Sequence, residues 1–209
     1  MHCMEHPHSS PVDWVGQEHL GFVINAAFSA ENASLISQWL EGLNQRVPQG
    51  IYTMPLQSLH ITVLDWVAPL FDYGGADKRA LYAQLYKTYE PVLRTTTDSM
   101  GTFDIQFSEL KVTPGAIILV GQDDGQFAHL RDTFMNAVEM PEGGKQPPTI
   151  IHSSLARFIA PQIKLSQVED YVIEHPLDFI QTISEFRLIE TRREPMQDFS
   201  VIDNFKLTR

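Results

Sequence analysis

Two short stretches of the sequence each place a histidine and a hydroxyl side chain two residues apart among apolar residues. The first is SLHITVL, residues 58–64, with His60 and Thr62, and the second is IIHSSLA, residues 150–156, with His152 and Ser154. Residues two apart in a β-strand share one face, so each histidine has a hydroxyl beside it. An imidazole in an apolar strand costs free energy unless it has a partner. We therefore interpret both stretches as candidate functional sites.

These residue types meet the needs of phosphodiester chemistry. A neutral histidine takes a proton from water or from a ribose hydroxyl, and a protonated one gives a proton to the departing oxygen. Both forms are accessible near neutral pH because the unperturbed pKa of histidine is about 6.5. The hydroxyls of Thr62 and Ser154 would donate hydrogen bonds to the non-bridging phosphate oxygens. This chemistry requires neither a metal ion nor a cofactor, and we expect none.

The hydrophobic pattern predicts which elements carry these residues. We expect strands at 19–28, 58–66, 103–112, 116–121, 149–158, 178–194 and 199–208, the last two as a hairpin. Helices are expected at 30–47 with Ser29 before them, at 77–97, at 127–138 and at 165–174. Pro91 would kink or shorten the second of these helices.

The order of the expected elements repeats, with a strand, a helix, a histidine strand, a helix and closing strands in each half. This order predicts an α+β fold with two pseudo-symmetric lobes, each an antiparallel sheet with helices packed outside, and a cleft between the sheets. An approximate two-fold axis would bring His60 and His152 together. We expect a flexible leader at 1–18 and one bilobal domain at 19–209, with lobes at about 19–112 and 113–209 that exchange terminal strands if the topology requires it.

One His-x-Ser/Thr motif alone is weak evidence, and a third copy, at His8, is interpreted as accidental. The matched positions of the other two give them weight. LHITV and IHSSLAR resemble the paired signatures of the two-histidine (2H) phosphoesterase superfamily, which includes RNA 2',5'-ligase-like proteins and cyclic nucleotide phosphodiesterases. The resemblance implies that His60 and His152 are catalytic, that Thr62 and Ser154 bind phosphate, and that all four line a central cleft.

Three further residues are candidate substrate contacts. Trp66 falls on the His60 face of its strand and would stack a nucleobase, or it is simply packed. Arg157 would add positive charge, although strict alternation places it on the face opposite His152. Tyr73 would lie at the rim of the cleft. Asp65 would repel a phosphate, and strict alternation turns it away from the cleft.

Other conspicuous residues have simpler interpretations. The sequence EGGKQPP around Lys145 lacks the spacing of a phosphate-binding P-loop and is interpreted as a mobile loop. Asp123 and Asp124 are expected to cap the helix that follows them. The remaining histidines have no hydroxyl at the motif spacing in a strand and are interpreted as surface, packing or leader residues.

Composition limits the classes of function. The chain has 209 residues, 43% of them hydrophobic, and a formal net charge of −11. This charge disfavours a surface that binds long nucleic acid, whereas a small anionic ligand needs only a local group of donors. A single cysteine, no signal peptide and no membrane-spanning run of apolar residues predict a cytoplasmic protein without disulfides. We expect a monomer with no membrane partner.

The sequence thus predicts a metal-independent phosphodiesterase that hydrolyses a small diester, such as a nucleoside 2',3'-cyclic phosphate or an RNA end. Two alternatives remain open. One is RNA 2',5'-ligase-like activity, because the same acid and base support the reverse reaction. The other is a non-catalytic module that binds a nucleotide or an RNA end.

Overall fold

The computed structural model describes residues 12–142, 144–161 and 163–208 of the chain. The first eleven residues of the expected leader lie outside this range. In chain order the elements are β1 (Glu18–Ala27), α1 (Ala30–Arg46), β2 (Ile51–Thr53), a 3-10 turn (Leu56–Ser58), β3 (His60–Val67), α2 (Lys78–Asp98), β4 (Phe103–Val112), β5 (Ala116–Gln122), α3 (Gln126–Ala137), β6 (Ile151–Phe158), α4 (Leu165–Glu174), β7 (Phe179–Ile183), β8 (Glu185–Arg193) and β9 (Asp198–Lys206).

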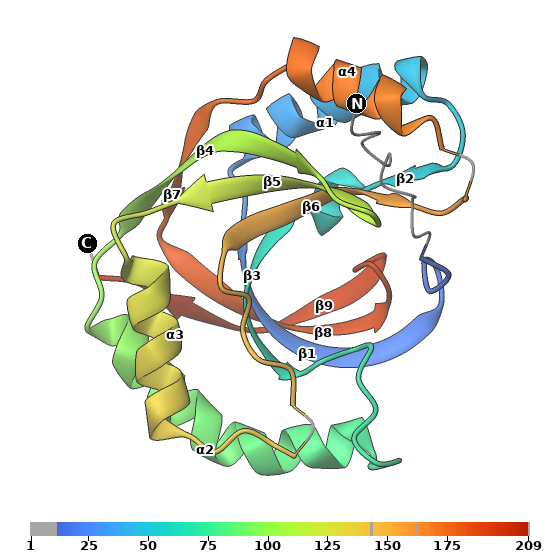
Figure 1. Ribbon diagram of the computed structural model, residues 1–209. Coiled ribbons are helices and arrows are strands. Elements are labelled where there is room, and N and C mark those ends of the chain that lie inside the picture. The colour runs from blue at the N-terminus through green and yellow to red at the C-terminus, as the bar shows by residue number, and fades with distance from the viewer. Residues whose placement is uncertain (1–11, 143, 162, 209) are drawn as a thin grey trace, which may run out of the picture.

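The strands form two antiparallel sheets that face each other. Sheet A has the strand order β3-β1-β8-β9, and sheet B has the order β2-β6-β5-β4-β7. Helices α1 and α4 lie on the outer side of sheet B, and α2 lies on the outer side of sheet A with α3 beside it (Figure 1). The expected α+β architecture, with helices outside and two antiparallel sheets, is confirmed.

Each sheet combines strands from both halves of the sequence. The C-terminal strands β8 and β9 complete sheet A, whereas β2 and β4 from the first half lie in sheet B. The histidine strands β3 and β6 belong to different sheets and contact each other. This contact brings the two motifs together although 92 residues separate His60 from His152.

Helix α1 shows how the sequence fixes one of the outer layers. Ser29 caps the helix, because its hydroxyl accepts a hydrogen bond from the backbone N–H of Asn32 at 3.2 Å. Helix α1 packs against α4, and the Trp39 indole N–H donates to the backbone carbonyl of His175 at 2.6 Å. In return, the Tyr171 hydroxyl donates to the Trp39 carbonyl at 2.8 Å. These bonds fix α4 against α1.

Two local expectations differ from the structure, and one short strand was not expected. The expected strand at 178–194 is two strands, β7 and β8, which lie in different sheets and meet at Ser184. The short strand β2 was not predicted, since it has only three residues. Pro91 does not end α2, which runs from Lys78 to Asp98. None of the described helices is long and apolar enough to cross a membrane.

Candidate active site

A cleft of about 380 Å³ lies between the two sheets and contains all four motif side chains. His60 and Thr62 enter it from β3, and His152 and Ser154 enter it from β6. The residues between each histidine and its hydroxyl, Ile61 and Ser153, are buried. The alternation predicted from the sequence therefore holds through the first three residues of each motif.

After the hydroxyl residue, each histidine strand contains a β-bulge. In β3 the partners are Asn25 with Thr62 and then Ile24 with Leu64, so one residue of β3 is extra. In β6 the partners are Ile118 with Ser154 and then Ile117 with Ala156. An extra residue shifts the side-chain alternation by one, so residues beyond it exchange faces.

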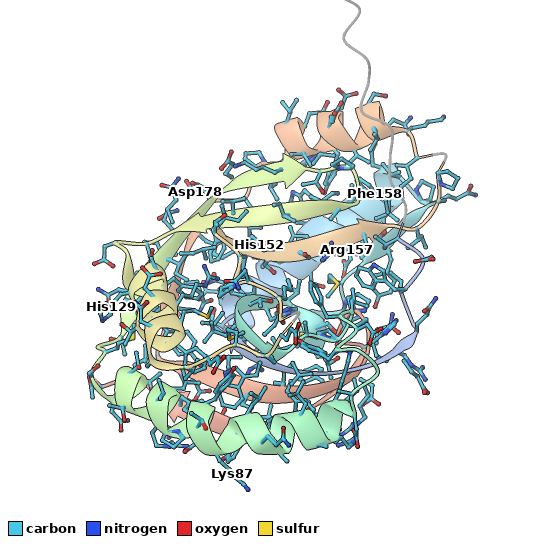
Figure 2. All side chains as sticks on the ribbon, turned by 60° about the horizontal axis from the view of Figure 1, so that its bottom comes forward. Lys87, His129, His152, Arg157, Phe158 and Asp178 are labelled. Atoms are coloured by element: carbon cyan, nitrogen blue, oxygen red, sulfur yellow. The ribbon has the colours of Figure 1, made fainter. Side chains whose placement is uncertain are left out.

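The bulges overturn two expectations about orientation. Asp65 and Arg157, each five residues after a histidine, both line the cleft instead of pointing away from it. Figure 2 shows Arg157 on the same strand as His152. The two residues occupy equivalent positions of the two motifs and carry opposite charges. Strict alternation was therefore the wrong assumption for both strands.

Arg157 is held beside the β6 motif. Its Nη2 donates to the Ser154 hydroxyl at 2.8 Å, and its guanidinium lies 5.3 Å from the centre of the Trp14 ring. Its Nε is buried without a hydrogen-bond partner among the described residues. A buried, unpartnered donor on a cation is suited to an anionic ligand. Burial lowers the pKa of Arg157, which favours a ligand that compensates the charge.

Trp66 does not contact the cleft. Trp66 follows the bulge and stands at a second register shift of β3, between Asp65 and Val67, and its side chain is fully buried against α2 and α3. Its ring centre lies 5.5 Å from that of Tyr89 and 6.2 Å from that of Phe134. The proposed stacking of a nucleobase on Trp66 is therefore wrong, and simple packing is the correct interpretation.

Replacing Trp66 with alanine is expected to lower the free energy of unfolding by about 3–5 kcal/mol, because it leaves a large cavity in this aromatic cluster. Urea unfolding of the variant and of Trp66→Phe measures the loss, which should be smaller for phenylalanine. A loss below about 1 kcal/mol for Trp66→Ala would contradict this placement.

Tyr73 is also absent from the lining of the cleft. Its hydroxyl accepts a hydrogen bond from the backbone N–H of Ala68 at 2.8 Å, which fixes the loop after β3. Leu70 and Phe71 of that same loop line the outer part of the cleft instead. A structural role therefore accounts for Tyr73.

Two further residues, outside the histidine strands, line the cleft although the sequence did not predict it. Lys145, in the loop before β6, places its Nζ 2.7 Å from a carboxylate oxygen of Asp65. Glu194, at the end of β8, is buried and accepts a hydrogen bond from the Thr191 hydroxyl at 2.9 Å. Burial raises the pKa of Glu194, and the nearby Asp65 raises it further. The cleft thus pairs acidic and basic groups.

The segment at 12–17, which we expected to be part of a flexible leader, reaches the cleft as well. The backbone N–H of Val12 donates to the Phe158 carbonyl at 2.8 Å, and Trp14 lines the cleft. The apolar mouth of the cleft is formed by Trp14, Pro69, Leu70 and Phe71, of which Leu70 and Phe71 are exposed.

The orientation of His60 is fixed by a backbone carbonyl. Its Nδ1 lies 2.7 Å from the carbonyl oxygen of Ser58. Since a carbonyl only accepts, Nδ1 carries the proton of the neutral ring and Nε2 is left as an acceptor. Burial lowers the pKa of His60 to about 4, and the positive charges of Arg187 and His152 also disfavour the protonated ring. The ring of His60 is therefore neutral at pH 7, with Nε2 as its acceptor.

The pKa of His152 is also lowered, first by burial and then by the positive charges of Arg157, Arg131 and Lys145. The backbone carbonyl of Ile150 opposes this shift. A bound phosphate would bring negative charge between the two rings and raise the pKa of both. The geometry therefore couples protonation of a histidine to the binding of an anion.

The lowered pKa of His60 predicts acid sensitivity. The folded protein favours the neutral ring, so its contribution to stability is complete above the unfolded pKa of about 6.5 and is lost as pH falls towards 4. Wild type is expected to lose about 2–3 kcal/mol more than His60→Gln between pH 7.5 and 4.5, because glutamine does not titrate. Urea unfolding at the two pH values measures this, and equal losses in both proteins would contradict it.

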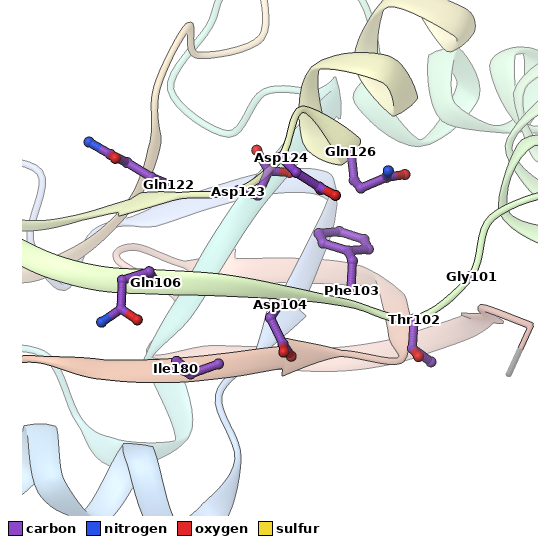
Figure 3. Close-up of a pocket in the computed structure, with 10 residues that line it drawn as sticks. All are labelled: Gly101, Thr102, Phe103, Asp104, Gln106, Gln122, Asp123, Asp124, Gln126 and Ile180. Atoms are coloured by element: carbon purple, nitrogen blue, oxygen red, sulfur yellow. The ribbon is translucent and has the colours of Figure 1, made fainter.

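A larger hollow, of about 530 Å³, lies at the outer edge of sheet B where α3 begins (Figure 3). Two of its three carboxylates, Asp104 and Asp123, accept hydrogen bonds within the fold, whereas Asp124 accepts none from the described residues. Asp123 accepts hydrogen bonds from the backbone N–H groups of Gly125 and Phe127, and Asp104 accepts one from Thr182. Asp123 thus caps α3 as predicted, and this hollow holds no comparable group of acid, base and cation.

Within residues 12–142, 144–161 and 163–208, no group of three or more His, Cys, Asp or Glu side chains is arranged to hold a metal ion. His129 is exposed on α3, and His175 stacks on Tyr171 with ring centres 4.2 Å apart. Both fit the packing and surface roles expected for them.

Comparison with solved structures places this architecture among known folds. Escherichia coli LigT in its apo form superposes with a TM-score of 0.64 at 13% identity, over 92% of this chain and all of that one. The chain has the LigT fold. A crystal structure described as a phosphoesterase gives a TM-score of 0.65 at 14% identity, over 92% of this chain and 99% of that one. The fold that the motif resemblance implied is therefore confirmed.

A third structure with this fold is TT0787 of Thermus thermophilus, with a TM-score of 0.57 at 18% identity over 90% of this chain and 97% of that one. No family model and no curated protein matches the sequence. The LigT-like fold is thus recognised from the structure, whereas the chemistry must be argued from the cleft.

Proposed function

We propose that the protein is a metal-independent phosphodiesterase that hydrolyses a small diester, such as a nucleoside 2',3'-cyclic phosphate or an RNA end. The observation that carries the proposal is the convergence of two histidines, two hydroxyls and the Arg157 side chain on one cleft, with the ring of His60 oriented by the Ser58 carbonyl and Arg157 bonded to Ser154. Crystal structures of E. coli LigT, which shares the fold, have been obtained with phosphate and with 3'-AMP, a nucleotide of the product class.

In the proposed reaction the phosphate lies between the two imidazoles. Arg157 and the hydroxyls of Thr62 and Ser154 donate hydrogen bonds to the non-bridging oxygens and stabilise the charge that develops there. His60, neutral with a free Nε2, takes a proton from the attacking water. His152, protonated when the anion binds, gives its proton to the departing ribose oxygen. One P–O bond forms and one breaks, and the product is a phosphomonoester.

The size of the cleft favours a compact substrate. A volume of about 380 Å³ lies within the usual range for small-molecule sites, roughly 300–1,000 Å³. The apolar mouth of Trp14, Leu70 and Phe71 would contact the nucleoside, and Asp65 and Glu194 would accept hydrogen bonds from its polar edge.

The test is turnover of the four nucleoside 2',3'-cyclic phosphates and of a short RNA with a 2',3'-cyclic end, each in EDTA. We expect a 2'- or 3'-monophosphate product, identified by chromatography against both standards. Joining of RNA ends without hydrolysis would instead support ligase-like activity. Binding of 3'-AMP with no turnover of any substrate would overturn the enzymatic proposal in favour of a binding module.

A further inference from the structure

Arg131 is a buried arginine on the inner face of α3, with 7% of its surface exposed. It forms no ion pair with any residue that the structure describes. Its guanidinium instead donates to two backbone carbonyls of β3, from Nε to Val63 at 3.0 Å and from Nη2 to Thr62 at 2.9 Å. The guanidinium also lies 5.1 Å from the centre of the Phe127 ring. The buried guanidinium of Arg131 thus binds backbone carbonyls of β3 instead of an acidic side chain.

The two carbonyls belong to consecutive residues. In a regular strand successive carbonyls point to opposite edges, so one planar guanidinium would not reach both. Arg131 binds both carbonyls at the β3 bulge, where the register shifts by one residue between the pairs Asn25–Thr62 and Ile24–Leu64. Because β3 is an edge strand of sheet A, its outer edge has no neighbouring strand within that sheet. The two N–H groups of the Arg131 guanidinium, from Nε and Nη2, therefore fit the bulged edge of β3.

The bulge determines which side chains of β3 line the cleft. Thr62 lies immediately before it and faces the cleft, and the shifted alternation turns Asp65 into the cleft as well. Arg131 contacts none of the cleft-lining side chains through its hydrogen bonds, which end on the backbone. The charge of Arg131 acts on His152 at a distance. An effect of its hydrogen-bond geometry on a bound phosphate, by contrast, must pass through the β3 backbone at Thr62 and Val63.

We propose that Arg131 is a positioning residue of the active site, whose guanidinium holds the β3 bulge so that the Thr62 hydroxyl is aimed at the phosphate. The inference rests on the proposed function, because it assigns Thr62 to phosphate binding. Through Arg131, helix α3 from the second half of the sequence would hold the backbone of β3, the histidine strand of the first half.

The conservative variant Arg131→Lys separates geometry from charge, because lysine keeps the positive charge but lacks the fork. It is expected to weaken binding of inorganic phosphate, measured by calorimetry, about tenfold, and to lower kcat/KM for a nucleoside 2',3'-cyclic phosphate by a similar factor. Arg94→Lys is the matched control. Arg94 also forks between two partners, Glu90 and Asp203, but it lies on α2 and is not among the cleft residues.

A double-mutant cycle with Thr62→Val distinguishes positioning from general stabilisation. If Arg131 acts through Thr62, Arg131→Lys should weaken phosphate binding less than about twofold once the hydroxyl is absent. A general loss of stability would weaken binding equally in both backgrounds, and that additive result would overturn the inference.

The two readouts keep this inference separate from the proposed function. Phosphate binding with the expected coupling, but no turnover of any diester, would support the role of Arg131 and overturn the enzymatic proposal. Turnover with additive effects would support the enzyme and overturn the role of Arg131. Absence of phosphate binding in the wild type would overturn both. Unfolding in urea is measured for every variant, so that binding is compared only among folded proteins.

Discussion

Replacement of His60 or His152 with alanine is expected to lower kcat/KM for a nucleoside 2',3'-cyclic phosphate by about a hundred- to ten-thousandfold. His60→Ala removes the proposed proton acceptor, whose Nε2 is left free by the bond from Nδ1 to the Ser58 carbonyl. His152→Ala removes the proposed proton donor. Steady-state kinetics at pH 7 measures both losses. The double variant should lose little more than either single one, because the two histidines act as a unit.

The matched control for these variants is His129→Ala. His129 is exposed on α3 and is not among the residues that line the cleft. Its replacement should leave kcat/KM unchanged within about twofold. Retention of more than about a tenth of wild-type activity by either cleft variant would contradict the proposed acid and base roles.

The second large effect is expected at Arg157. Arg157→Met should lower kcat/KM by about a hundred- to a thousandfold, because it removes a buried cation whose Nε is unpartnered and whose Nη2 holds Ser154. Arg157→Lys should recover only part of this loss, since an ammonium group does not reproduce two directed N–H groups. The comparison of kcat with KM shows whether the loss lies in binding or in the chemical step.

Arg79→Met provides the control for Arg157. Arg79 pairs with Glu190 and is largely exposed, so its loss removes a surface cation without altering the cleft. If Arg157→Met were as active as Arg79→Met, the arginine would have a packing role against Trp14 rather than a role in phosphate binding.

The first residues of each motif were predictable because their pattern is local. His60 with Thr62, and His152 with Ser154, alternate with apolar residues, and that period assigns both pairs to one face of a strand. The fold class also followed from the order of elements. The bulges did not follow, because apolar residues continue on both faces after each hydroxyl and hide the change of alternation.

That hidden shift explains the errors at Asp65, Trp66 and Arg157, which all lie beyond a bulge. The roles of Lys145 and Arg131 depend on contacts between elements distant in the sequence. Arg131 in addition binds backbone carbonyls, and because every residue has one, the sequence does not indicate this partner. The split of 178–194 into β7 and β8 was hidden for a similar reason, since its residues favour strand throughout and only the tertiary structure assigns them to two sheets.

The most direct measurement is the pH dependence of kcat/KM for a nucleoside 2',3'-cyclic phosphate between pH 4 and 9 in EDTA. An acid and a base in one cleft predict a bell-shaped profile that persists in the chelator, with the acidic limb lost in His60→Ala and the alkaline limb lost in His152→Ala. A flat profile, or activity that disappears in EDTA and returns with a divalent metal, would contradict catalysis by the paired histidines.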